Sequence, residues 1–246
     1  ISGLTAAGQR LALQAFEAWT YATGLTFRQT TGTADLTLDD NSSGAFAGPD
    51  WVQLDPSVPF GTLEIVRSSV NVGTGWLSSY GSQLNTYSFS TYVHEIGHAL
   101  GLGHAGNYDG SATFSRDALY LNDSTQMSIM SYFDLIDNTF LPGSYWEPVT
   151  PMIADILAIQ SLYGAPASMH GGNTVWGVNS NVGGYLGQVF DYVFDGQRAD
   201  GVNWSSGADA NPVGFTIYDT GGQDVLDVSN WSGAQVIDMR PEGISN

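Results

Sequence analysis

The stretch His94-Glu95-Ile96-Gly97-His98-Ala99-Leu100-Gly101-Leu102-Gly103-His104 contains three of the four histidines in this chain. It has the pattern H-E-x-x-H-x-x-G-x-x-H. Four residues span slightly more than one helical turn, so His94 and His98 are predicted to project from one face of a helix. Glu95 lies beside that pair, where its carboxylate is placed to act on a water molecule rather than to bind a metal ion.

The second half of the motif completes a possible ligand set. His104 lies too far along the chain to share the face of His94 and His98 if the helix continues. Gly101 is predicted to adopt a positive φ and end the helix, so that the chain turns back and His104 joins the pair. Three neutral imidazoles leave a fourth coordination position open, which is typical of catalytic rather than structural zinc. The alternative is a set of core histidines without a metal, but a core histidine is usually single.

A second motif, Ser128-Ile129-Met130-Ser131-Tyr132, follows the third histidine. The extended zinc motif followed by such a methionine is the signature of the metzincins, in which a tight turn places the methionine beneath the metal. Met130 is flexible and polarizable, so it is expected to form the floor of the site without competing for the ion. The S-I-M-S-Y sequence resembles one branch of the metzincins, the serralysins. That resemblance implies that Tyr132 reaches the zinc as an additional ligand.

The resemblance to the serralysins extends to three further segments in the same order. Residues 87–91 lead into the zinc helix, residues 155–164 resemble the helix that closes the family's catalytic domain, and residues 215–227 resemble the entry into its calcium-binding β-roll. The resemblance implies an α+β metzincin catalytic domain, with a twisted mixed sheet and helices, over residues 1–165. It implies an all-β region over residues 166–246, namely a partial, calcium-binding parallel β-roll that is truncated relative to the family.

Periodicity predicts the individual elements of the first domain. Apolar residues recur with helical spacing from Leu11 to Ala22, so a helix there is expected to pack on a sheet. Further helices are predicted at residues 90–100 and 151–163. Strands are predicted at residues 25–29, 35–39 and 64–72, with an irregular edge strand at 44–54. Residues 105–150 have no long period and are predicted to form a loop region that contains the methionine turn.

After Gly164 the pattern changes to short apolar runs with a two-residue period, which is typical of strands. These runs are residues 189–194, 213–218, 225–228 and 236–239. Pro166 and the pair Gly171-Gly172 suggest a domain boundary. One stretch, residues 221–226, resembles the glycine-rich calcium-binding repeat, with Gln223 in place of its third glycine. Family members carry several such repeats, so the chain is expected to hold only the first part of that domain.

The fourth histidine, His170, is interpreted through the same resemblance. It implies a structural calcium site in which backbone carbonyls at His170 and Gly172 and an oxygen of Thr174 serve as ligands, and calcium prefers such hard oxygen donors. The remaining implied donors come from a later segment and are Asp219, Gly221 and Asp224. Gly222 and Asp224 are also implied to serve a neighbouring calcium ion, whose other family ligands lie beyond residue 246. The alternative is a surface histidine in a glycine-rich linker.

Charge and composition narrow the classes of partner. The chain has 24 acidic residues and six arginines but no lysine, and its formal net charge is −18. Such a surface would repel phosphate backbones, so nucleic acid is not expected as a partner. The acidic side chains are expected both to bind calcium and to keep a secreted protein soluble. No apolar run is long enough to span a membrane. Cysteine is absent, so no disulfide holds the fold.

These features predict a secreted zinc endopeptidase of broad specificity with one catalytic zinc and one or more structural calcium ions. His94, His98 and His104 would bind the zinc, which activates a water, and Glu95 would act as general base. By resemblance, Tyr132 leaves the metal and hydrogen-bonds the tetrahedral intermediate. The expected partners are protein or peptide substrates and, through the family, a small proteinaceous inhibitor. The resemblance also implies a monomer in the bacterial extracellular space.

Two alternatives to this function stay open. One is a non-catalytic, calcium-stabilised binding or surface module with a relic zinc site, although the intact Glu95 argues against a relic. The other is a matrixin-like or different metzincin endopeptidase, against which the S-I-M-S-Y turn and the single calcium-type repeat argue.

Overall fold

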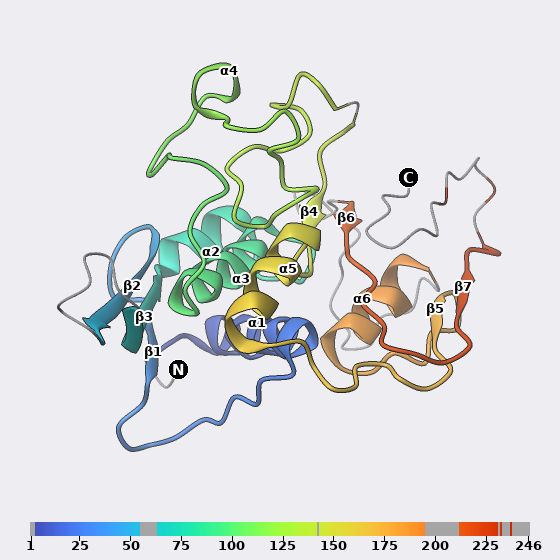
Figure 1. Cartoon of the computed structure of the whole chain (residues 1–246), viewed down its shortest axis with the longest axis horizontal. Helices are drawn as coiled ribbons and strands as arrows, with labels where there is room; N and C mark the ends of the chain where they lie inside the picture. The colour runs from blue at the N-terminus through green and yellow to red at the C-terminus, as the bar shows by residue number, and fades with distance from the viewer. Residues whose placement is uncertain are drawn as a thin grey trace. The chain divides into compact units, whose positions relative to one another are not determined.

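The computed structural model describes residues 3–54, 63–141, 143–194 and 212–230, with the single residues Ser232 and Ile237 (Figure 1). These residues fall into two compact units. The first contains the described residues up to Ala167, joined by residues 212–218. The second contains the described residues from Ser168 to 194 and those from Asp219 onward.

The first unit begins with the long helix α1 (Ala6–Thr23). The hydroxyl of Thr5 accepts a hydrogen bond from the amide of Gly8 at its start, and Gly24, with φ 73°, ends it. The predicted stripe is completely buried and consists of Leu11, Ala15, Ala18, Trp19 and Ala22. This confirms the predicted N-terminal helix, because an apolar stripe at helical spacing is what a helix buries against its neighbours.

The sheet of the first unit has three strands in the order β1-β3-β2. Strand β1 (Leu36–Asp39) runs parallel to β3 (Leu63–Val72), and β2 (Ala45–Gln53) runs antiparallel to it. The predicted mixed sheet is therefore confirmed. Within the described residues β2 forms one edge of this sheet, and its register shifts between Asp50 and Trp51. The irregular edge strand predicted at residues 44–54 is confirmed as well.

Helix α3 (Tyr87–Ala99) carries the zinc motif and packs against β2, β3 and α1. The indole nitrogen of Trp19 donates to the carbonyl of Val93 at 2.9 Å, and the hydroxyl of Ser68 donates to the carbonyl of Ala99 at 2.9 Å. These two bonds tie α3 to helix α1 and to strand β3. The short helix α2 (Thr74–Tyr80) precedes α3, and helix α5 (Ile153–Tyr163) packs on α1. Figure 1 shows α3 in green beside α1 and α5.

One predicted strand of the first unit is wrong. Residues 25–29 pair with no strand in the described part of the chain. Their alternation of half-buried and exposed side chains is real, but Phe27 packs on Phe16 of α1, with 4.8 Å between the ring centroids. The segment therefore buries its apolar side chains against a helix and not within a sheet.

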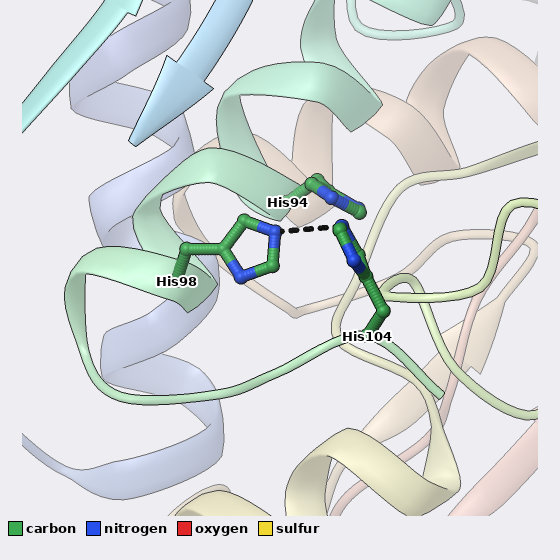
Figure 2. A group of neighbouring side chains, drawn as sticks. All are labelled: His94, His98 and His104. Carbon is green, nitrogen blue, oxygen red and sulfur yellow. Dashed lines mark hydrogen bonds between the residues drawn. The ribbon is translucent and has the colours of Figure 1, made fainter. Parts of the chain in front are cut away.

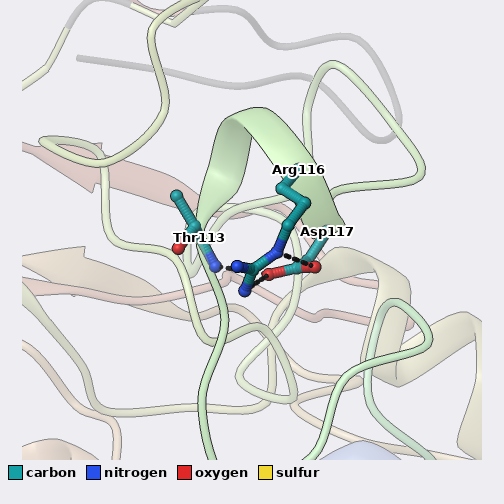
Figure 3. Close-up of polar contacts among 3 residues, drawn as sticks. All are labelled: Thr113, Arg116 and Asp117. Carbon is teal, nitrogen blue, oxygen red and sulfur yellow. Dashed lines mark hydrogen bonds and ion pairs between the residues drawn. The ribbon is translucent and has the colours of Figure 1, made fainter.

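Residues 105–150 are largely irregular, as predicted, and contain the short helix α4 (Phe114–Asp117). Its Arg116 pairs with Asp117 at 2.7 Å, and the amide of Thr113 donates to the same carboxylate at 2.7 Å (Figure 3). Arg116 therefore holds the pKa of Asp117 at about 2. The segment ends in strand β4 (Glu147–Pro148), which runs parallel to β6 (Val213–Gly214).

The second unit contains a parallel pair of strands, β5 (Val175–Gly177) and β7 (Val225–Asp227), and helix α6 (Gly184–Val193). The strand predicted at residues 225–228 is confirmed. The strand predicted at 189–194 is wrong, and so is the expectation that this whole region is all-β. Tyr185, Leu186, Val189 and Phe190 are buried, which is the spacing of one helical face, and a six-residue window was too short to reveal it.

Two other predicted strands have different outcomes. Of residues 213–218, only Val213 and Gly214 form a strand, and they lie in the first unit. The run at residues 236–239 lies outside the described residues apart from Ile237. None of the helices in the described part of the chain combines the length and the apolarity needed to cross a bilayer.

Candidate metal centre

The three histidines of the motif converge on one point. His94 and His98 project from the same face of α3, with 4.7 Å between their ring centroids. Gly101 has φ 106°, and the chain turns there so that His104 comes back to the pair. One ring nitrogen from each histidine lies within 4.8 Å of the other two, and the rings point toward one another (Figure 2). The predicted ligand set is therefore brought together.

The other ring nitrogen of each histidine is held by a backbone carbonyl. Each Nδ1 lies 2.7 or 2.8 Å from its oxygen, and the pairs are His94 with Ile129, His98 with Leu102, and His104 with Tyr108. A carbonyl only accepts hydrogen bonds, so each Nδ1 carries the proton and each Nε2 is left with its lone pair. Such carbonyl partners are what orients the histidine ligands of metals.

This arrangement needs a cation. The Nε2 atoms of His98 and His104 are 3.0 Å apart, and in these tautomers both are acceptors. A proton is a poor substitute, because burial lowers the pKa of both rings and lowers that of His94 to about 3. Three imidazole lone pairs that face one another suit a zinc ion with an open fourth position. The donor set therefore fits the metal that the sequence predicts.

Glu95 lies on α3 between the first two ligands and is buried, with 7% of its surface exposed. Burial, with a smaller contribution from Asp109, raises the pKa of Glu95 to about 7. Its Oε2 atom is buried and has no hydrogen-bond partner among the described residues. A carboxyl group whose pKa lies near neutrality is suited both to accept and to return a proton.

Met130 lies beneath the motif and is fully buried. A Cβ atom added to Gly97 of α3 would come within 2.8 Å of the Met130 sulfur and within 2.8 Å of the Trp19 ring. Glycine at position 97 therefore lets the methionine turn approach the helix backbone closely. This contact was not predicted from the sequence, although the position of the glycine within the motif is a visible signal.

Asp155 of α5 holds the methionine turn in place, and it was not predicted as a site residue. Its carboxylate accepts hydrogen bonds from the Ser128 hydroxyl at 2.6 Å, the Ile129 amide at 2.7 Å and the Met152 amide at 2.8 Å. Ile129 is also the residue whose carbonyl orients His94. The available signal was a single acidic residue in an otherwise apolar helix, because an acidic side chain is rarely buried unless its carboxylate has bonding partners.

Tyr132 lies at the same site. Its ring centroid is 4.4 Å from that of His104 and 6.0 Å from that of His94. Its hydroxyl accepts a hydrogen bond from the amide of Gly110 at 3.4 Å. Tyr132 is thus beside the candidate zinc ligands.

The predicted calcium ligands lie together in the second unit. The hydroxyl of Thr174 lies 3.2 Å from the carbonyl oxygen of His170 and 3.3 Å from that of Gly172. The Thr174 amide donates to Asp224 Oδ1 at 3.0 Å. A Cβ atom on Gly222 would lie only 2.2 Å from the oxygen of Gly172, so the two loops touch through their backbones.

Asp219 contributes a carboxylate to the same loops. One of its oxygens accepts a hydrogen bond from the amide of Gly221 at 2.9 Å. Its other oxygen is buried and has no hydrogen-bond partner among the described residues. A buried carboxylate oxygen without a donor is costly, and a bound cation would satisfy it. The oxygen-rich donor set therefore fits calcium.

Comparison with known proteins agrees with this geometry. The matrixin family model, of the peptidase M10 group, matches residues 5–115. The chain is 31% identical to the metalloprotease AprA of Pseudomonas entomophila, over 87% of this chain and 38% of that protein. It is 30% identical to the metallopeptidase AprA of Pseudomonas marginalis, over 94% and 46% respectively. It is 34% identical to serralysin C of Dickeya chrysanthemi, over 71% and 34%.

The chain spans less than half the length of these relatives. The shared region nevertheless includes the zinc motif and the methionine turn, whose side chains the fold brings to one site. On this combination of sequence, ligand geometry and similarity, the chain belongs to the serralysin family of metzincins.

Proposed function

We propose that the chain is a secreted zinc endopeptidase of broad specificity. The observation that carries this proposal is the set of three imidazoles whose Nε2 atoms converge while each Nδ1 is held by a carbonyl. Glu95, with its pKa raised to about 7, lies next to the first ligand. The metalloprotease and serralysin names of the relatives support the same activity.

The residues of the site have separate roles in peptide hydrolysis. His94, His98 and His104 would hold a zinc ion, which would lower the pKa of a bound water and polarise the scissile carbonyl. Glu95 accepts the proton of the attacking water and then delivers a proton to the leaving amine. Tyr132, placed beside His104, would be a further ligand of the metal in the resting protein and would donate a hydrogen bond to the oxygen that gains negative charge during the reaction.

Broad specificity follows from the way a substrate would bind. Strand β2 forms an edge of the sheet and packs against α3. A peptide added to this edge would form main-chain hydrogen bonds, which every sequence provides. Backbone pairing would then supply much of the affinity, and side-chain preference would be weak.

The second unit supports a structural role for calcium. His170, Gly172 and Thr174 would supply oxygens from one loop, and the other proposed donors are Asp219, Gly221, Gly222 and Asp224. The orphaned oxygen of Asp219 and the backbone contact between the loops favour this site. The parallel pair of β5 and β7 is compatible with the beginning of a parallel β-roll. We retain the proposed division into a catalytic part, residues 1–165, and a calcium-binding part, residues 166–246.

The setting and the partners of the protein are inferred from the family. We propose a monomer in the bacterial extracellular space that acts on proteins or peptides and is open to inhibition by a small protein. The net charge of −18 makes nucleic acid an unfavourable partner.

The decisive test replaces Glu95 with glutamine. Glu95→Gln should keep the zinc content of the native chain, while kcat on casein falls by about 10²- to 10⁴-fold, the usual contribution of a general base. Zinc is measured by elemental analysis and turnover by a digestion assay with and without chelator. Glu64→Gln, at an exposed position on β3, is the matched control and should behave like the native chain.

Two results would overturn the proposal. Full peptidase activity of Glu95→Gln would remove the general base from the mechanism. A native chain that binds zinc but cleaves neither casein nor gelatin would favour the non-catalytic binding module.

A further inference from the structure

A buried carboxylate lies in the segment between the third zinc ligand and the methionine turn. Asp123 is 4% exposed, and the Ser131 hydroxyl donates to its Oδ1 atom at 2.7 Å. The Tyr108 hydroxyl donates to both of its oxygens, at 3.2 and 3.3 Å. Within the described residues, Asp123 is thus held by hydroxyl groups, whereas the partly buried Asp117 pairs with Arg116 (Figure 3).

The burial of such a carboxylate costs free energy. Burying an ionised group without a cation requires good hydrogen bonds to replace its hydration. A carboxylate can only accept hydrogen bonds, so the Tyr108 hydroxyl, which lies within 3.3 Å of both oxygens, is the donor. The two donors of Asp123 are therefore fixed in direction, and each leads to a different part of the zinc site.

The first donor, Tyr108, leads to the third zinc ligand. Its backbone carbonyl accepts from His104 Nδ1 at 2.7 Å, and its ring stacks on the imidazole with an interplanar angle of 25°. The ring of Tyr108, whose hydroxyl bonds to Asp123, thus packs against one face of the His104 imidazole. A change in the orientation of this ring would move the Tyr108 carbonyl, which sets the tautomer of His104.

The second donor, Ser131, leads to Tyr132. Ser131 directly precedes Tyr132, and its oxygen also accepts from the amide of Phe133 at 3.1 Å. The amide of Tyr132 donates to the Tyr108 hydroxyl at 3.4 Å, and the two tyrosine rings lie 4.9 Å apart. The backbone on both sides of Tyr132 and the ring beside it are therefore tied to the same carboxylate.

We infer that Asp123 is a positioning residue that sets the orientation of Tyr132 relative to His104, through Ser131 on one side and Tyr108 on the other. Among the described residues, the side-chain hydrogen bonds of Asp123 go to Ser131 and Tyr108, and it acts on Tyr132 and His104 through these two neighbours. The inference rests on the proposed function, because it assigns Asp123 a part in the placement of Tyr132 for zinc-dependent hydrolysis. It predicts a defect in turnover and not in substrate binding.

Substitution of Asp123 tests this role by the division between kcat and KM. Asp123→Ala should lower kcat by about 10- to 100-fold, the usual effect of removing a residue that orients a metal ligand. KM should stay within about twofold, since substrate contacts are unchanged. Asp123→Asn keeps one acceptor oxygen and should recover most of the lost turnover. Asp137→Asn removes an exposed acid from the same loop and should leave both constants unchanged.

A double-mutant cycle identifies the residue through which Asp123 acts. If it acts through Tyr132, Asp123→Ala should add less than about twofold to the loss caused by Tyr132→Phe alone. An additive loss in the Tyr132→Phe background overturns the inference, as does native kcat for Asp123→Ala. If circular dichroism shows that Asp123→Ala does not fold, Ser131→Ala and Tyr108→Phe are used in its place in the same cycle. Each of these variants removes one of the two hydroxyl donors to Asp123.

A spectroscopic measurement separates this inference from the proposed function. A phenolate bound to copper(II) gives a charge-transfer band in the visible range, so the copper-substituted native chain should show it and Tyr132→Phe should not. Asp123→Ala should weaken or shift the band, and an unchanged band overturns the inference. The proposed function fails instead if the native zinc protein does not cleave peptides, whatever the copper spectrum shows.

Discussion

The two candidate cation sites are built in opposite ways. The zinc site takes its ligand atoms from three imidazole side chains, and the backbone acts one step away through the carbonyls of Ile129, Leu102 and Tyr108. The proposed calcium site would take several of its oxygens from the backbone itself, as at His170 and Gly172, whose carbonyls face the Thr174 hydroxyl. The identity of the side chains therefore determines the first site, whereas the path of the backbone determines the second.

The comparison also shows what each site requires of the fold. Two zinc ligands come from a single helix that is buried among β2, β3 and α1. The proposed calcium donors come from two loops separated by about fifty residues in the chain, and the close approach of these loops depends on glycine at position 222. The zinc site should therefore be sensitive to single ligand substitutions, and the calcium site to changes in carboxylates and glycines.

The largest effect is expected from loss of a zinc ligand. His104→Ala removes one of three imidazoles, so activity should fall by more than about a hundredfold, beyond the usual effect of losing an outer-shell partner. Zinc content, measured after dialysis, should fall in parallel. Retention of stoichiometric zinc and of native turnover by His104→Ala would contradict the assignment of this ligand.

A smaller but clear effect is expected from the calcium site. Calcium at a hundred times its dissociation constant should stabilise the native chain by about 2.7 kcal/mol. Asp219→Asn should lose most of that gain, because it changes the carboxylate whose buried oxygen has no donor among the described residues. The measurement is thermal unfolding of the full chain with and without calcium. Asp191→Asn on α6 is the matched control, and equal calcium responses in both variants would count against the site.

Acid should weaken the metal-free chain through the zinc histidines. Burial lowers the pKa of all three, and that of His94 to about 3. In the pH range between the unfolded pKa of about 6.5 and the lowered folded pKa values, the unfolded chain binds more protons than the folded chain. The free energy of unfolding therefore falls as the pH falls through this window. Above it the effect vanishes. Urea unfolding over a pH series measures the slope, and His94→Gln should make it shallower; an identical slope would contradict the lowered pKa.

The smallest effect is expected at the fourth histidine. His170→Ala removes an imidazole but keeps the carbonyl that is proposed to bind calcium, so the calcium response should change little. The φ of 51° at this position is a left-handed conformation that strains histidine and alanine alike, so the substitution should lower stability only slightly, and equally with and without calcium. His170→Gly relieves that strain and serves as control. Loss of the calcium response in both variants would show that the side chain is itself a ligand.

Much of the metal centre could be predicted because its geometry is local. The i, i+4 spacing of His94 and His98 places both on one face of any helix, and Gly101 turns the chain as its positive φ requires. The helix that contains Leu11 and Trp19 was visible for the same reason, since its stripe has the period of the element itself.

The errors arose where a short pattern had more than one physical solution. The alternation around Phe27 is satisfied by a contact with Phe16 on a helix, and not by pairing in a sheet. The run that begins at Val189 belongs to one face of α6, because the buried residues Tyr185 and Leu186 extend it at helical spacing. In both cases the neighbouring element decided the conformation, and a window of five or six residues does not contain that neighbour.

By itself the sequence determined which atoms are available to bind a metal, because residue type and helical spacing settle that locally. Only the tertiary structure decided how those atoms are oriented. The carbonyl of Ile129, the carboxylate of Asp155 beneath the methionine turn and that of Asp123 behind it reach the site from other segments. Hydrogen bonds between such segments leave no periodic trace along the chain, and they form only when the packed core brings their donors and acceptors within about 3 Å.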